Sequence, residues 1–255
     1  MKHRIVIILI VLAATLLADQ VVSVWAAKLV PSSEFPGYSL KFILRRAITC
    51  IPLIIALFLI HKPKEILPSL GLNKNILYGL GVAVICTLPL LIGFPIIGTF
   101  NPELSYDHAF RNIVLAAIYE EVVYRGFMFG QLFRYGKIGF LWAVLLPAVL
   151  FGLGHIYQGH DLSSSLLAFG VTFVGALYFS WIYVEWNFNL WVPIGLHALM
   201  NMCWILFPVE GNETAIGAFV PNLLRISSIL IAIGLTVMHR RKAGEKVFGY
   251  PIVNI

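Results

Sequence analysis

Apolar runs long enough to cross a bilayer recur along almost the whole of this 255-residue chain, separated by short polar segments. A transmembrane helix needs about 20 predominantly apolar residues. We therefore expect about eight such helices, at residues 5–27, 41–60, 76–100, 112–133, 140–157, 162–184, 190–207 and 219–238. Only 12% of the residues are charged, against about 25% in a soluble domain. The predicted fold is an all-α, polytopic membrane bundle.

The predicted helices leave no room for a sizeable soluble domain, so we expect one integral membrane domain over residues 1–255. The basic residues 1–4 followed by an apolar run are also compatible with a cleavable signal peptide. No small-x-small cleavage site follows Ala18, and apolar residues resume at Val21, which favours an uncleaved first helix. The polar loops predicted between these helices include residues 31–37 and 209–214.

The net charge of +6 is explained by basic anchoring residues in cytoplasmic loops, so we expect the lipid bilayer and no nucleic acid as a partner. An even number of helices puts both termini on one side. More Lys and Arg fall on that side, which predicts cytoplasmic termini in a plasma-membrane protein, although the basic residues 41–46 argue against it. Cys50, Cys86 and Cys203 lie in separate apolar runs and predict neither a disulfide framework nor a cysteine metal site.

Small residues predict where helices approach closely. The sixth predicted helix carries Gly170 and Gly175, whose small size would permit close packing of another helix.

The fourth predicted helix places Glu120, Glu121 and Arg125 inside an apolar run. Each charge at bilayer depth costs about 2.5–3.5 kcal/mol on insertion scales, so such charges indicate function. Glu121 and Arg125 are four residues apart and share a helix face, while Glu120 lies about 100° around the helix from Glu121. We expect Glu121 and Arg125 to form a structural ion pair and Glu120 to remain free to act.

Two later helices carry the other polar side chains expected at membrane depth. Of the seven histidines, only His155 and His197 fall inside apolar runs, with Phe151 and Asn201 at helical i,i+4 spacing from them. Taken singly, these residues read as helix-bridging or packing residues. Taken together, three polar helix faces must converge to avoid facing lipid. Convergence would bring a carboxylate together with two imidazoles.

Two chemistries suit such a cluster, and the residues leave both open. Glu120, His155 and His197 form a possible zinc set with water in the fourth position. Without a metal, Glu120 could take a proton from water, His155 could orient that water, and His197 with Asn201 could donate to an oxyanion. The sequence contains no Gly-x-Ser-x-Gly nucleophile motif and no pair of intramembrane aspartates. The cofactor expectation is therefore either none or zinc.

These residues, in this order, resemble the CAAX protease and bacteriocin-processing (CPBP, or Abi) family of intramembrane proteases. The family pattern is E-E-x-x-x-R, then F-x-x-x-H, then H-x-x-x-N or D. The corresponding residues are Glu120, Glu121 and Arg125, then Phe151 and His155, then His197 and Asn201. The resemblance covers a core of residues 112–207, which we expect to be the catalytic part.

The resemblance implies hydrolysis of a peptide bond by an eight-span helical enzyme. It makes Glu120 the general base with His155 as its partner, and His197 with Asn201 the oxyanion-stabilising pair. A metalloprotease is the older alternative. The substrate is expected to be a membrane-bound or amphipathic protein or peptide, either a C-terminal prenyl-cysteine protein or a processed peptide such as a bacteriocin or a peptide signal.

Two other functions compete with this one. A non-catalytic immunity or chaperone-like membrane protein would use the same fold for binding alone. A carrier would need polar residues along a path between the two faces, and the sequence shows one cluster instead. With cytoplasmic termini, His155 and Asn201 approach the outer face, whereas a site for cytoplasmic prenyl proteins should open inward.

Overall fold

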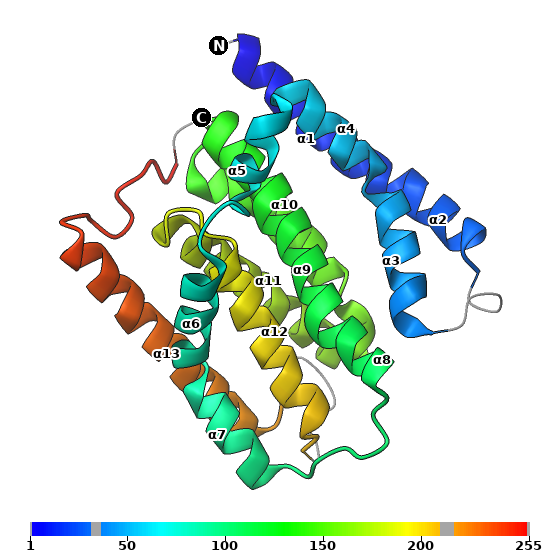
Figure 1. The fold of residues 1–255 in the computed structure, drawn as a ribbon, viewed down its shortest axis with the longest axis vertical. Coiled ribbons are helices and arrows are strands. Elements are labelled where there is room, and N and C mark those ends of the chain that lie inside the picture. The colour runs from blue at the N-terminus through cyan, green and yellow to red at the C-terminus, as the bar shows by residue number, and fades with distance from the viewer. Residues whose placement is uncertain (1, 32–36, 210–216, 254–255) are drawn as a thin grey trace.

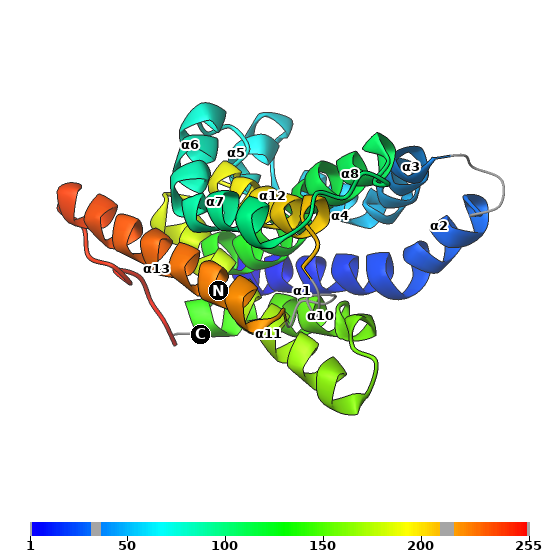
Figure 2. The ribbon, with the colours of Figure 1, turned by 90° about the horizontal axis from the view of Figure 1, so that it is seen from below.

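The computed structural model describes residues 2–31, 37–209 and 217–253, and every regular element in these ranges is a helix. Figure 1 shows the two termini at one end of the bundle and the connection between α7 and α8 at the other. Figure 2 shows α13 along one flank and α2 at the opposite flank. The predicted all-α bundle is confirmed. Most residues of the two predicted polar loops, 31–37 and 209–214, lie outside the described ranges.

The first three predicted helices are all present. The first is continuous, running through α1 (Lys2–Leu16), the wide π-type turn η1 (Leu17–Val22) and α2 (Ser23–Leu29). The second and third are pairs bent by 44° and 52°: α3 (Tyr38–Thr49) with α4 (Ile51–Ile60), and α6 (Ile76–Cys86) with α7 (Leu88–Ile97). Pro52 and Pro89 open the second helix of each pair, and proline cannot donate the backbone hydrogen bond that a continuous helix needs.

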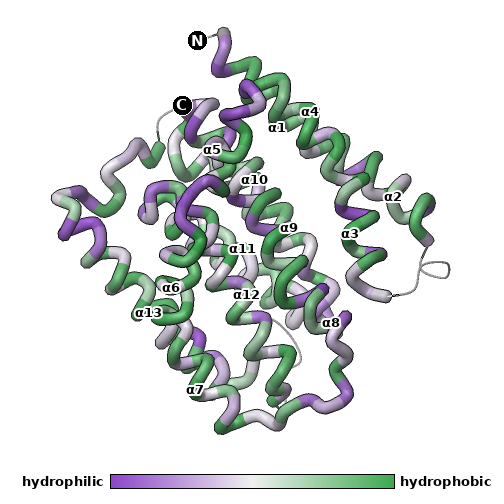
Figure 3. Tube along the Cα trace, in the orientation of Figure 1, coloured by the Kyte–Doolittle hydropathy of each residue, from purple (hydrophilic) through white to green (hydrophobic). Residues whose placement is uncertain are grey.

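The later helices are α10 (Phe140–Leu153), α11 (Leu162–Glu185), α12 (Trp191–Leu206) and α13 (Phe219–Lys242). Among the described residues, four helices are long and apolar enough to cross a membrane, or six if each bent pair is one span. Figure 3 shows hydrophobic residues along most of these helices and hydrophilic ones gathered mainly near their ends. Several apolar crossings of this kind are typical of an integral membrane protein.

Two of the eight predicted spans do not meet that criterion. The 16 residues of α12 extend about 24 Å at 1.5 Å per residue, less than the roughly 30 Å of a hydrocarbon core. The fourth helix is long enough, but it contains Glu120, Glu121 and Arg125. These two helices carry the first and third polar motifs, and none of residues 111–135 or 191–206 is exposed, so other helices shield them from lipid.

The fourth helix runs without a break from residue 106 to residue 135, with wide π-type turns where a regular α-helix is predicted. Its segments are α8 (Tyr106–Phe110), η3 (Arg111–Leu115), α9 (Ala116–Glu120), η4 (Glu121–Phe129) and η5 (Gln131–Tyr135). Asp107 accepts hydrogen bonds from the backbone N–H groups of Tyr38 and Ser39. This contact caps α3 and fixes its start against the fourth helix.

Close helix packing occurs at glycines other than the predicted ones. A Cβ on Gly152 would lie 2.8 Å from the ring of Phe169, and one on Gly195 would lie 2.7 Å from the Cβ of Ala83. These contacts join α10 to α11 and α6 to α12. Gly170 and Gly175 would permit such packing, but no neighbouring helix uses them, because a Cβ on either would have no atom within 4 Å. Small size permits close approach but does not determine which helix face meets a neighbour.

Two chain segments, the turn after α5 (Ile66–Leu70) and the C-terminal tail, connect helices at the end of the bundle where the termini lie. After η2 (Pro63–Glu65) and α5, Gly71 adopts a φ of +77°, and a Cβ there would lie 2.0 Å from the carbonyl oxygen of Phe188. The C-terminal tail returns to the start of α10, where the carbonyl of Pro251 accepts a hydrogen bond from the N–H of Phe140. This bond satisfies one of the free N–H groups at the helix start.

Candidate active site

A cavity of about 760 Å³ opens between the first helix, α3, the fourth helix and the C-terminal ends of α10 and α12. Four of the predicted site residues line it: Glu120, His155, His197 and Asn201. Glu121 and Arg125 lie behind the wall and are fully buried. The expected convergence of three helices on one polar pocket is therefore observed.

Glu121 is held by two partners. Its Oε1 accepts a hydrogen bond from Nη1 of Arg125 at 3.0 Å and one from Nδ1 of His197 at 2.8 Å. The predicted ion pair between Glu121 and Arg125 is confirmed. Because the helix of Glu121 and the helix of His197 are far apart in sequence, this carboxylate also joins α12 to the fourth helix.

The guanidinium of Arg125 is enclosed by aromatic rings. Its central carbon lies 4.6 Å from the ring centroid of Phe151 and 5.3 Å from that of Phe179. Cation–π contacts of this kind stabilise a desolvated cation. Phe151 is itself buried, so the aromatic residue of the second motif serves as a platform for the buried arginine.

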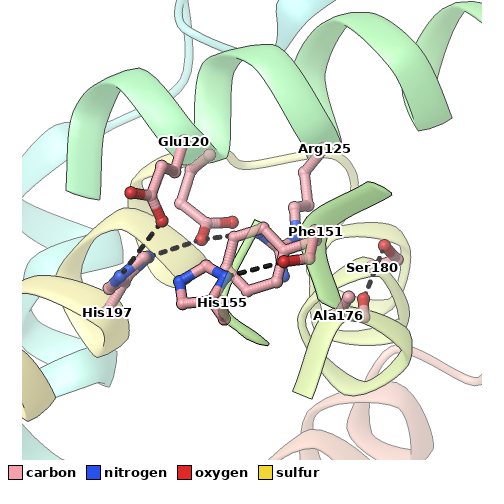
Figure 4. Close-up of polar contacts among 8 residues, drawn as sticks. Glu120, Arg125, Phe151, His155, Ala176, Ser180 and His197 are labelled. Atoms are coloured by element: carbon pink, nitrogen blue, oxygen red, sulfur yellow. Dashed lines mark hydrogen bonds and ion pairs between the residues drawn. The ribbon is translucent and has the colours of Figure 1, made fainter. Parts of the chain in front are cut away.

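Glu120 is the carboxylate that faces the cavity. Its side chain is 24% exposed, and its Oε2 lies 3.8 Å from Nε2 of His197. Since Nδ1 of His197 is bound to Glu121, the ring is oriented with Nε2 toward Glu120. Figure 4 shows these two side chains pointing toward each other from their separate helices.

His155 lies just after the C-terminal end of α10. Its Nδ1 is 2.6 Å from the carbonyl oxygen of Phe151, and its ring packs against the ring of Phe151 at 4.4 Å. A carbonyl can only accept, so Nδ1 carries the proton and Nε2 is left as an acceptor. Figure 4 draws the imidazole on the side of the Glu120 helix where His197 also lies.

Asn201 follows His197 by one helical turn and lines the same cavity. Its Nδ2 donates to the backbone carbonyl of Asn112 at 3.0 Å. That bond fixes the amide against the wide turn η3, with His197 Nε2 and the Asn201 amide on one helix face. Both groups thus line the cavity that Glu120 also lines.

Several cavity residues are absent from the predicted site. Tyr124 lies one turn after Glu120 and packs edge-on against Phe151 at 5.0 Å; its i,i+4 spacing from Glu120 is the signal that could have identified it. Asp19 lines the cavity from the wide turn η1. Arg46 and Arg111 also line it, although Arg46, at the start of the second span, reads as a membrane-interface residue by position alone.

The donor geometry bears on the predicted zinc set. Among the described residues, no three His, Cys, Asp or Glu side chains are grouped so that they could hold a metal ion. Glu120 and His197 are neighbours, but the set of Glu120, His155 and His197 is not such a group. Zinc dependence stays a prediction, and none of the chemical steps below passes through a metal.

The comparisons with known proteins agree with the motifs. Residues 103–203 match the family described as type II CAAX prenyl endopeptidase, Rce1-like. Over 97 residues the chain is 32% identical to the candidate membrane peptidase YdiL of Bacillus subtilis (strain 168), an alignment that covers 38% of this chain and 35% of YdiL. The chain thus spans about a third of the length of that curated relative. The expected resemblance is confirmed for the segment that runs from the fourth helix into α12.

Proposed function

We propose that this integral membrane protein is an endopeptidase that hydrolyses a peptide bond of a membrane-associated protein or peptide. The family match over residues 103–203 supports a membrane peptidase. One observation carries the assignment of residues. Oε2 of Glu120 faces Nε2 of His197 at 3.8 Å in a cavity that His155 and Asn201 also line.

Glu120 acts on water as a general base. The water oxygen bonds to the carbonyl carbon of the substrate while its proton passes to the Glu120 carboxylate. The tetrahedral intermediate then collapses, the C–N bond breaks, and Glu120 returns the proton to the leaving amine. The partial exposure of Glu120 leaves room for that water, whereas buried Glu121 has none.

The neighbouring groups each perform one task. Asn201 and His197 donate to the oxyanion, and each is held by a bond on its far side, to Asn112 and to Glu121. His197 acts as an imidazolium, with Nδ1–H bonded to Glu121 and Nε2–H left to donate. His155 accepts a hydrogen bond from the attacking water through Nε2, because its Nδ1 is committed to the carbonyl of Phe151. The Glu121–Arg125 pair positions His197 and does not touch the substrate.

The surroundings of the cavity favour a substrate that is itself embedded in the membrane. A second, mostly apolar groove of about 1030 Å³ runs between α11, α12 and α13 and shares His155, His197 and Asn201 with the first. Gly170 and Gly175 line it, which accounts for the open space beside them. An apolar chain or helix lying in this groove brings an attached peptide to Glu120, as a CAAX-type substrate or a processed peptide would require.

Part of the cavity lining lies at the end of the bundle opposite the termini. Asn101 and Leu104, in the connection between α7 and α8, line the cavity, and Figure 1 shows this connection far from both termini. With both termini in the cytoplasm of a plasma-membrane protein, the site faces outward. Single-cysteine labelling at residue 103 in intact cells tests this orientation: labelling by an impermeant maleimide supports it, and labelling only after lysis contradicts it.

The function is tested by comparing membrane-associated peptides in cells that carry the wild-type chain or Glu120→Gln. The proposal predicts fragments that appear only with the wild type, and their sequences identify the substrate. Equal peptide patterns together with an unchanged cellular phenotype would indicate a binding protein of the same fold. Glu103→Gln, on the connection before α8, is the matched control that leaves the pattern unchanged.

A further inference from the structure

Two guanidinium groups line the cavity that Glu120 also lines. Arg46 comes from α3 and Arg111 from the start of the fourth helix, and both side chains are partly buried. Among the described residues, no carboxylate lies within 4.0 Å of either guanidinium. The contacts of Arg46 are with the hydroxyl oxygen of Tyr119, at 3.4 Å, and with aromatic rings. Arg111 contacts the side-chain oxygen of Asn112.

Aromatic rings hold the two cations in place. The central carbon of Arg46 lies 4.5 Å from the ring centroid of Tyr119 and 5.3 Å from that of Phe42. The central carbon of Arg111 lies 5.2 Å from the same Phe42 centroid. Both cations therefore lie within about 10 Å of each other around one ring. Stacking leaves the in-plane N–H groups of a guanidinium available to an acceptor.

Two like charges in a partly buried cavity repel each other, and an anion between them removes that penalty. Asp19 and Glu120 line the same cavity, but neither is within ion-pair distance of Arg46 or Arg111. The guanidinium fork matches a carboxylate, which it can bind through two parallel hydrogen bonds. The cavity thus has a place for an anion that the chain itself does not supply.

We propose that Arg46 and Arg111 form a subsite that binds the free C-terminal carboxylate of the peptide substrate. This inference rests on the proposed function. Arg46 stacks on Tyr119, the residue before Glu120, and Arg111 lies nine residues before Glu120 on the same helix, roughly 13 Å away at 1.5 Å per residue. An extended peptide covers that distance in about four residues. The subsite therefore selects a bond close to the carboxyl end of the substrate.

The test uses the full-length protein in phosphatidylcholine nanodiscs. The probe is a pool of N-palmitoylated peptides with randomised sequence, prepared either as free C-terminal acids or as C-terminal amides. Cleavage is followed by mass spectrometry for the wild type, Arg46→Gln, Arg111→Gln and the double variant. Arg241→Gln, an exposed arginine in the last turn of α13, is the control for the loss of one positive charge.

The proposal predicts that the wild type and Arg241→Gln cleave the acid pool about tenfold or more faster than the amide pool. The Arg46→Gln/Arg111→Gln variant should cleave both pools at the same low rate, because substrate amidation and loss of the cations remove the same interaction. An acid-to-amide ratio that stays high in the double variant would overturn the proposal.

Two further arms separate the remaining outcomes. If wild-type protein cleaves neither pool, the proposed function fails. Binding of the acid and amide pools to Glu120→Gln, measured by fluorescence polarisation, then still tests the subsite. Preferential binding of the acid pool that is lost when Arg46 and Arg111 are substituted supports the subsite. Nanodiscs containing phosphatidylglycerol test a lipid phosphate as the anion. Activity that depends on the anionic lipid through Arg46 and Arg111, with no effect of amidation, would contradict a peptide carboxylate.

Discussion

His197 Nδ1 lies 2.8 Å from Oε1 of Glu121, so the fully buried carboxylate of the Glu-Glu pair fixes the imidazole that faces the other carboxylate. The two adjacent glutamates therefore have different tasks. Glu121 is bonded to Arg125 and His197 and lies outside the cavity, whereas Glu120 lies inside it and is partly exposed. On the proposed mechanism, Glu121 therefore contributes to the stability of the fold and Glu120 to catalysis, and substitutions of the two residues should have different effects.

Glu121→Gln is expected to lower the free energy of unfolding by about 3 kcal/mol, because it leaves the buried Arg125 without its counter-charge. Glu120→Gln is the matched control and should change it by less than about 1 kcal/mol, since Glu120 is partly exposed. Denaturant titration of both variants in the same detergent measures the difference. Equal losses in the two variants would contradict the division of roles, and Arg125→Met added to Glu121→Gln should recover part of the loss.

Asn201→Ala is expected to reduce kcat about 100-fold, as removal of an oxyanion donor does in other hydrolases. KM should change little, because the interaction is made mainly in the transition state. Asn73→Ala is the control, because Asn73 is exposed in the turn before α6 and lines neither cavity. Steady-state kinetics on the cleaved peptide measure both constants. A loss confined to KM would assign Asn201 to substrate binding alone.

Gly152→Ala and Gly170→Ala should have opposite effects on stability. The first forces a methyl group to within 2.8 Å of the Phe169 ring, which is overpacking of about 1–3 kcal/mol. The second adds a methyl group in open space and should stabilise the helix by up to about 1 kcal/mol. Thermal unfolding of the two variants distinguishes them. A destabilised Gly170→Ala would mean that a neighbouring helix packs closely against the face of α11 that carries Gly170.

Metal dependence is measured by removing metal from the purified protein. Because no three donor side chains are grouped among the described residues, we expect activity to survive extended dialysis against a chelator and zinc to be present at well below one ion per chain. Elemental analysis and an activity assay on the same sample provide the measurement. Loss of activity with chelation, restored by zinc, would show that the predicted set of Glu120, His155 and His197 assembles around a metal.

The sequence predicts the helical bundle and much of the site, since both depend on where polar residues interrupt apolar runs. The ion pair of Glu121 with Arg125 follows from i,i+4 spacing. The contact of Glu121 with His197 does not, because their separation in sequence contains no information on how α12 is rotated.

Other features needed the packed structure. Arg46 lies near the start of a predicted span, where a basic residue usually indicates the membrane interface, and only the placement of α3 brings it beside Glu120. The glycines show the same limit, since Gly152 and Gly170 are equally small and only one meets a neighbour. Its short length sets α12 apart from the outer helices, and its charged residues set the fourth helix apart from them.

The central claim is that Glu120 activates a water molecule for peptide hydrolysis. Its most direct test is cleavage of a palmitoylated peptide pool in water enriched in oxygen-18 by the wild type and by Glu120→Gln, with equal thermal unfolding of the two proteins as the control. The account predicts that wild-type protein places one heavy oxygen in each new carboxylate during single turnover, and that Glu120→Gln forms no product above background. Product formation by Glu120→Gln at the wild-type rate would contradict it.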